Sequence, residues 1–125
     1  MHLKKEDLPV AMEGPGTKFR FQGGFGGMVI AYWEMPAGPE NKALFEGLPN
    51  NACHCPHWGY VVKGEMTLHY ADGKDEVVKA GDVFYAPAGH TGKIDEDVAV
   101  IEISPEKEYM EVMQHVGKKM QAREI

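Results

Sequence analysis

The sequence predicts an all-β fold, and three observations support this class. Short segments rich in β-branched and aromatic residues recur along the chain. The 15 glycines and 8 prolines provide turns between these segments. Only one stretch, near the end of the chain, has apolar residues at helical spacing. A chain of 125 residues is near the commonest domain size, so we expect a single domain over residues 1–125.

About seven short strands are expected along the chain. The first, at 18–22 (KFRFQ), alternates polar with aromatic residues, and the glycines of GGFGG end it. The second, at 28–35 (MVIAYWEM), is rich in β-branched and aromatic residues. In the last strand, VAVIEI, we expect Glu102 to face outward. The strands after the second are expected at YVV (60–62), EMTLHY (65–70), EVV (76–78), VFYAP (83–87) and VAVIEI (98–103).

The remaining segments are expected to be turns, loops and one helix. Residues 1–12 are expected to be poorly ordered, and 36–52 form a long connection of a kind that is often functional. Asp72 and Gly73 predict a hairpin turn. Ser104 is a candidate N-cap, with Pro105 at the first position of a helix over about 105–121. The apolar face of this helix is expected to pack against the rest of the fold or a partner.

The composition excludes two classes of partner. The formal charge of −6 argues against nucleic-acid binding, which needs clustered lysine and arginine side chains. No apolar run approaches the roughly 20 residues that cross a bilayer. The start of the chain, MHLKKEDLPV, has no continuous apolar segment of the kind that follows the charged start of a signal peptide. We therefore expect a cytoplasmic protein that binds neither nucleic acid nor membrane.

The two cysteines lie in the segment CHCPH, together with two histidines. In an extended strand, residues two apart are separated by about 6.6 Å at Cα, with parallel side chains, which disfavours a Cys53–Cys55 disulfide. Strand alternation places Cys53, Cys55 and His57 on one face and His54 on the other. Pro56 distorts a strand, so Cys53 and His57 are stronger candidate metal ligands than Cys55. A pair of buried, non-ligating cysteines is the alternative.

Two glycine motifs give the chain its resemblance to a known family. Gly81 is followed by DVFYA and then by Pro87-Ala88-Gly89, and an apolar strand runs into Gly64 in YVVKGE. From residue 53 to about 103, the chain resembles a single-domain cupin. The resemblance implies a cupin-type jelly-roll β-barrel, with a barrel core at about 17–104 and a C-terminal α-helix.

The metal-ligand positions depart from the usual cupin pattern. Counting back from Gly64, cupins usually carry a glutamate seven residues earlier and histidines eleven and thirteen residues earlier; this chain has His57, Cys53 and Asn51 there. Cupins usually carry another histidine three residues after Pro-x-Gly. This chain has Gly92 at that position, although His90 directly follows Gly89. Because of these departures, the resemblance does not support assigning to this chain the oxygenase activity of cupins that have three histidines and one glutamate as ligands.

The donors that remain still predict a metal site. The expected ligands are Cys53, His57 and His90, with Cys55 as a candidate fourth. Sulfur and imidazole donors favour a divalent transition metal, first Zn²⁺ and then Fe²⁺, Ni²⁺ or Cu, over Mn²⁺ or Mg²⁺.

Three hypotheses for function follow. The first is a metal-dependent enzyme that acts on a small molecule in the barrel, with reaction class and substrate undefined. The second is a non-catalytic ligand-binding or sensing domain, in which four donors close around a structural metal or exposed paired thiols respond to oxidants. The third is a metal-free barrel that binds a ligand in an apolar cavity. The aromatic residues expected to fill the barrel, or in one or two cases to line a pocket, are Trp58, Tyr60, Phe84 and Tyr85.

Exposed sheet edges predict a homodimer. Related cupins often cover such edges by pairing through N-terminal strands, which makes KFRFQ (18–22) and MVIAYWEM (28–35) the candidate interface.

Overall fold

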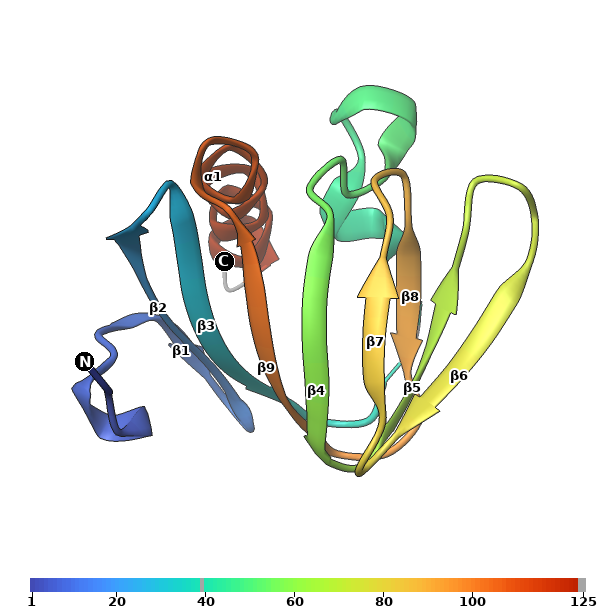
Figure 1. Ribbon diagram of the computed structural model, residues 1–125. Helices are drawn as coiled ribbons and strands as arrows, with labels where there is room; N and C mark the ends of the chain where they lie inside the picture. Colours follow the sequence, from blue (N-terminus) through green and yellow to red (C-terminus); the bar gives the residue numbers. More distant parts are fainter. Residues whose placement is uncertain (39, 124–125) are drawn as a thin grey trace.

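The computed structural model describes residues 1–38 and 40–123 and contains two facing antiparallel β-sheets and one α-helix (Figure 1). The strands are β1 (Val10–Gly14), β2 (Thr17–Phe25), β3 (Met28–Met35), β4 (His57–Lys63), β5 (Glu65–His69), β6 (Asp75–Lys79), β7 (Val83–Ala86), β8 (Thr91–Ile94) and β9 (Val98–Pro105). The helices are α1 (Glu106–Arg123) and the short 3₁₀ turns η1 (Lys5–Asp7), η2 (Lys42–Phe45) and η3 (Pro49–Asn51). The predicted all-β class with a C-terminal helix is confirmed.

The two sheets differ in size. The larger has the strand order β1-β2-β3-β9-β4-β7, and the smaller has the order β6-β5-β8. The last strand of the chain, β9, lies between β3 and β4, so it joins the N-terminal hairpins to the part of the chain that carries the two glycine motifs. At the turn before β5, Gly64 has φ 85° and lies so close to the Asp97 carbonyl that no Cβ would fit.

The core has two connected parts. The first fills the space between the sheets, with Trp33, Val61, Phe84 and Val100 among its members. The second lies beneath α1 and includes Tyr109, Val112 and Val116 from the helix, with Val29 and Ala31 from β3. The spacing of these helix residues produces one apolar face, which α1 buries against the inner side of the large sheet. Within the described residues, no helix combines the length and apolar character needed to cross a bilayer.

The structure differs from the sequence-based expectation at the N-terminus and in the small sheet. The first dozen residues are ordered: η1 and then β1 lie there, and β1 pairs with β2. The strand β8 was not expected, because TGKI contains a glycine and a lysine and has little strand propensity. It is held by pairing with β5 on one side.

The expected start of the helix and the expected side of Glu102 are also wrong. Ser104 and Pro105 belong to β9, and the Ser104 hydroxyl contacts His57 instead of capping α1. Glu102 is buried at 7% exposure and faces the barrel interior, whereas Ile101 and Ile103 face outward. Hydrophobic residues on the outer side of this strand misled the sequence-based assignment.

The aromatic residues after the Cys/His segment divide between the two faces of the large sheet. Phe84 fills the barrel as expected, but Trp58, Tyr60 and Tyr85 face outward and are 47%, 42% and 52% exposed. The expectation that all four fill the barrel or line a pocket is therefore wrong for three of them.

Candidate metal centre

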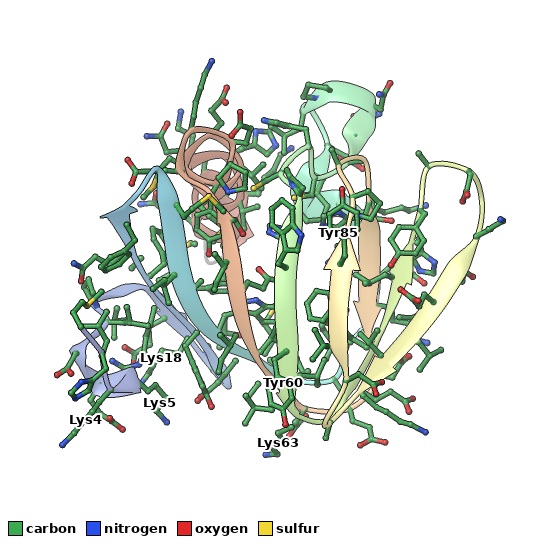
Figure 2. All side chains as sticks on the ribbon, viewed as in Figure 1. Lys4, Lys5, Lys18, Tyr60, Lys63 and Tyr85 are labelled. Atoms are coloured by element: carbon green, nitrogen blue, oxygen red, sulfur yellow. The ribbon has the colours of Figure 1, made fainter. Side chains whose placement is uncertain are left out.

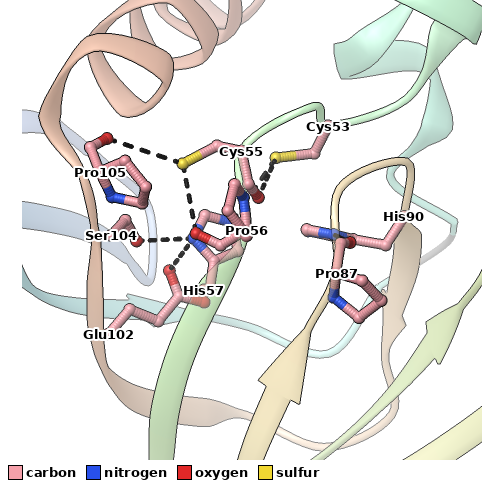
Figure 3. A network of polar contacts seen from close by, with 9 residues as sticks. All are labelled: Cys53, Cys55, Pro56, His57, Pro87, His90, Glu102, Ser104 and Pro105. Atoms are coloured by element: carbon pink, nitrogen blue, oxygen red, sulfur yellow. Dashed lines mark hydrogen bonds and ion pairs between the residues drawn. The ribbon is translucent and has the colours of Figure 1, made fainter.

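Cys53, His57 and His90 come together at one end of the barrel (Figure 3). Cys53 lies in the loop before β4, His57 is the first residue of β4, and His90 lies between β7 and β8. The Cys53 amide donates to the His90 carbonyl at 2.9 Å, and the Gly89 amide donates to the Cys53 carbonyl at 2.7 Å. These two backbone bonds fix the Cys53 and His90 segments side by side.

The distances among the three side chains suit a single metal ion. One donor atom from each residue lies within 4.8 Å of the others, and Cys53 Sγ is 3.5 Å from His57 Nε2. Zinc takes sulfur at about 2.3 Å and imidazole nitrogen at about 2.0–2.1 Å, so two such ligands in a tetrahedral shell are roughly 3.5 Å apart. The cysteine and His57 already have this spacing.

Both histidine rings are held by their Nδ1 atoms. His57 Nδ1 is 2.7 Å from Ser104 Oγ, and His90 Nδ1 donates to the Pro87 carbonyl at 2.8 Å. The bond to the Pro87 carbonyl leaves His90 Nε2 with a lone pair for another partner, and the Ser104 hydroxyl can accept from His57 Nδ1 and leave His57 Nε2 in the same state. Histidines that ligate metals in proteins are usually oriented in this way, through a hydrogen bond from the nitrogen that does not face the metal.

Burial sets the protonation states of the three donors. It lowers the pKa of His57 to about 4, and with help from the neighbouring His57 it lowers the pKa of His90 to about 4, so both rings are neutral near pH 7. Burial also raises the pKa of the Cys53 thiol to about 12. The neutral imidazoles are ready to ligate a cation, whereas the thiol must release a proton on binding. The residues therefore fit a transition-metal ion.

Glu102 is a site residue that sequence reasoning missed. Its Oε2 lies 3.6 Å from His57 Nδ1, and its side chain is among those that line the cavity beside the three donors. Burial raises the pKa of the Glu102 carboxyl to about 7, against the smaller opposing effects of His90 and Trp33. Glu102 lies two and four residues after Val100 and Val98, so strand alternation puts it on the same inward face as these valines. This alternation was the sequence signal that could have revealed it.

Cys55 is not part of this group. Its Sγ lies 3.4 Å from the Pro56 carbonyl and 3.9 Å from the Pro105 carbonyl, on the side of the loop facing β9 (Figure 3). Both thiols are buried, at 2% exposure for Cys53 and 0% for Cys55. The expectation that the paired thiols are exposed is therefore wrong.

The other two histidines of interest lie outside the group. The His69 side chain lies at the surface, 29% exposed, and its two ring nitrogens contact Asp75 and Glu40. The His54 side chain is 26% exposed: its Nε2 is 3.9 Å from Glu111, and its buried Nδ1 has no hydrogen-bond partner within the described residues. The helix α1, which carries Glu111, covers part of the His54 ring.

The three donors open onto a cavity of about 100 Å³ between the sheets, α1 and η2. Its walls are mainly apolar, with Trp33, Phe45 and Met113 among the largest side chains. Polar groups from Asn41, Thr67 and Thr91 also reach it. Apolar walls with a few convergent polar groups are typical of ligand sites, and the volume of about 100 Å³ limits a ligand here to a few heavy atoms.

Comparison with known proteins agrees with this fold. Residues 52–100 match the family model described as "Cupin domain". The search of curated proteins found no match to this chain. Together with the fold described above, the family match supports a single-domain cupin.

Several solved structures share the fold. An RmlC-like cupin from Shewanella frigidimarina is 23% identical, with a TM-score of 0.56 over 80% of this chain and 86% of its own. The polyketide cyclase RemF from Streptomyces resistomycificus is 19% identical, with a TM-score of 0.55 over 84% of this chain and 78% of its own. The cupin domain of Schizosaccharomyces pombe Cnp3 is 20% identical, with a TM-score of 0.53 over 76% of this chain and 64% of its own. At these identities the likeness shows the fold alone.

Proposed function

We propose that this cupin binds a divalent transition metal, Zn²⁺ first and Fe²⁺ or Ni²⁺ next, through Cys53, His57 and His90, and acts there on a small molecule. The observation that carries the proposal is the meeting of the three donors, with both Nδ1 atoms already bonded elsewhere. Three protein ligands leave a coordination position for substrate, as in catalytic zinc sites. A bound ion supplies Lewis-acid chemistry at an oxygen atom.

The residues around the donors suggest how the site handles its substrate. The cavity walls of Trp33, Phe45 and Met113 favour a small, largely apolar molecule, and the metal end requires an oxygen or nitrogen donor on it. Glu102 lies beside His57 and lines the same cavity, so it is the candidate group for holding or moving a proton near bound substrate. Ser104 keeps the His57 ring in its orientation.

A non-catalytic domain with a closed structural metal is the alternative. It needs a fourth protein donor, and Cys55 was the candidate. Because the Cys55 thiol points toward Pro105 and away from the other three, a closed shell would require this loop to rearrange. The open arrangement is therefore the better-supported proposal, and polyketide cyclase RemF shows that the same fold serves in an enzyme.

Metal content tests the ligand assignment. Protein purified without a histidine tag and loaded with Zn²⁺ is expected to hold one ion per chain by elemental analysis. The double variant Cys53→Ala, His57→Ala is expected to hold almost none, and the matched variant Cys55→Ala to hold one. Unchanged zinc in the double variant, or zinc loss with Cys55→Ala, would contradict the assignment.

We also propose that the protein is cytoplasmic and forms a homodimer. A free thiol ligand suits a reducing compartment. The large sheet ends at β1 on one side and at β7 on the other, and proteins usually cover such edges or the faces beside them.

A further inference from the structure

The outer face of β4, β7 and β9 carries a contiguous set of apolar side chains. Strand pairing places them in two rows: Trp58 lies between Ile103 and Tyr85, and Tyr60 lies between Ile101 and Val83. We call these six residues the apolar face. Their exposed fractions run from 37% for Ile101 to 81% for Val83. Within it, the Trp58 and Tyr85 rings lie 5.3 Å apart.

This pattern is unusual for a sheet that meets water on one side. Such strands normally alternate apolar residues inside with polar residues outside. In β4 the outward residues after Trp58 are Tyr60 and Val62, and in β9 the outward Ile101 and Ile103 are more hydrophobic than the inward Glu102 and Ser104. Strands that are apolar on both faces are typical of sheets covered on both faces.

The neighbouring part of the same outer face is already covered by the chain itself. Residues 1–8 lie over β3: Lys5 Nζ is 5.2 Å from the centre of the Tyr32 ring, and Leu8 is buried at 4% exposure. The Leu8 carbonyl accepts a hydrogen bond from Arg20 of β2. Cover of this kind stops before β4 and β7.

Charged side chains lie around the apolar face and not within it. In Figure 2, Lys4, Lys5 and Lys18 are on the N-terminal side and Lys63 is at the far end of β4, while Tyr60 and Tyr85 lie on the outer face. A charge-free centre bordered by charged groups resembles the core and rim of a protein interface.

We propose that the apolar face is the contact surface of a two-fold homodimer in which the large sheets of two copies stack face to face. This inference rests on the proposed homodimer and moves its interface from the N-terminal strands to β4, β7 and β9. A two-fold axis matches a patch with itself, and an uncharged apolar face meets no like-charge repulsion from its own copy.

The area of the apolar face suits a second copy. Six side chains of roughly 150–250 Å² each, about half exposed, present on the order of 500 Å² of surface. Two copies together would bury on the order of 1,000 Å², the lower bound for a specific interface.

Sedimentation velocity with one variant and a matched control tests the proposal. Wild-type protein at micromolar concentration is expected to have twice the 13.9 kDa mass of one chain. Val83→Lys places a charge in the interface and is expected to weaken dimerisation by about 100-fold or more. Val77→Lys, the same change at a valine that is 55% exposed on β6 of the other sheet, is expected to leave the dimer intact.

The outcomes separate the two parts of the inference. A monomeric wild type overturns the dimer itself. If both Val83→Lys and Trp58→Glu remain dimeric, the homodimer exists but the apolar face is not its interface, whether the true contact is the β2–β3 region or another. Acrylamide quenching of Trp58 gives an independent reading, because Trp33 is buried: quenching is expected to rise on dilution, and no change would contradict the proposal.

Discussion

Two groups of histidines in this small barrel use the same side chain in opposite ways. In the buried pair, His57 and His90, each ring has one nitrogen bonded to a neutral oxygen and the other turned toward a thiol or an open cavity. On the surface, both nitrogens of His69 contact carboxylates, Asp75 Oδ1 and Glu40 Oε2, each at 2.7 Å.

The comparison shows what makes a histidine available for chemistry. Burial lowers the pKa values of His57 and His90, so their rings stay neutral and retain a lone pair. Hydrogen bonds to Asp75 and Glu40 raise the pKa of His69, which favours the form with a proton on each nitrogen. The buried pair is suited to ligate a cation, and His69 is suited to tie the 36–52 loop to β5 and β6.

The largest expected difference between the two groups is in zinc affinity. His57→Ala, His90→Ala and Cys53→Ala are each expected to lower zinc affinity by at least about 100-fold, beyond the 10–100-fold typical of an orienting partner. His69→Ala is expected to leave it unchanged, because both of its nitrogens are already bonded. Competition with a chromophoric chelator measures these affinities. Equal losses in the buried and surface variants would abolish the distinction.

The pH dependence of folding of the metal-free protein should also separate the groups. Between about pH 4 and 6.5 the unfolded chain binds protons at both histidine positions, whereas the folded chain keeps His57 and His90 neutral, so stability is lost as pH falls. Glu102 acts in the opposite direction, because its raised pKa lets the folded chain hold a proton between about pH 4.5 and 7.

The sum of these three groups gives a measurable slope. In this range the unfolded chain binds two more protons at the histidines and one fewer at Glu102 than the folded chain, a net difference of one proton. The free energy of unfolding is therefore expected to rise by about 1.4 kcal/mol per pH unit between pH 4.5 and 6.5. Glu102→Gln removes the opposing effect and is expected to double the slope. Urea denaturation at a series of pH values measures both, and a shallower slope in Glu102→Gln would contradict the burial of these groups.

A smaller effect is expected at Ser104. Ser104→Ala removes the hydrogen bond to His57 Nδ1 without touching a metal donor, so zinc affinity is expected to fall about 10-fold to 100-fold. The same chelator competition measures it, with Cys55→Ala as the matched control because Cys55 lies in the same buried region. A Cys55→Ala loss as large as that of Ser104→Ala would mean that packing, and not orientation of the ring, explains the effect.

The smallest expected effect is at the surface histidine. Exposed ion pairs contribute roughly 0–1 kcal/mol, so His69→Gln is expected to change global stability by less than about 1 kcal/mol. Because the pKa of His69 is raised, the contacts to Glu40 and Asp75 are strongest below its ordinary pKa of 6.5 and weaken as pH rises through the raised value. Hydrogen exchange of the Asn41 and Leu44 amides should therefore quicken in His69→Gln and at high pH. Unchanged hydrogen exchange at these two amides would show that the His69 contacts to Glu40 and Asp75 do not hold the loop.

The sequence predicted the donors better than their surroundings. Strand alternation put Cys53, Cys55 and His57 on one face, but Cys53 lies in the loop before β4 and Cys55 turns away from the other two. The position after Pro-x-Gly pointed to His90, which does lie beside Cys53 and His57. The sequence analysis did not predict Glu102 as a site residue, because the hydrophobic pattern of β9 favours Ile101 and Ile103 as the buried residues. Only the pairing of β9 with both β3 and β4 reveals which side is inside.

Ser104 and the strand β8 illustrate the same limit. Serine followed by proline and glutamate fits a helix N-cap, but the two residues extend β9 and the hydroxyl reaches His57, which is 47 residues away in sequence. In β8, Gly92 lies so close to the Thr67 carbonyl that a Cβ would stand 2.9 Å from it. Both features arise from tertiary contacts that no local pattern encodes.

X-ray absorption at the zinc edge of the loaded protein tests the central claim most directly. The account predicts one sulfur at about 2.3 Å and two imidazole nitrogens at about 2.0–2.1 Å, with the remaining position occupied by a non-protein oxygen. A shell with two sulfurs, or one without sulfur, would contradict a site built from Cys53, His57 and His90.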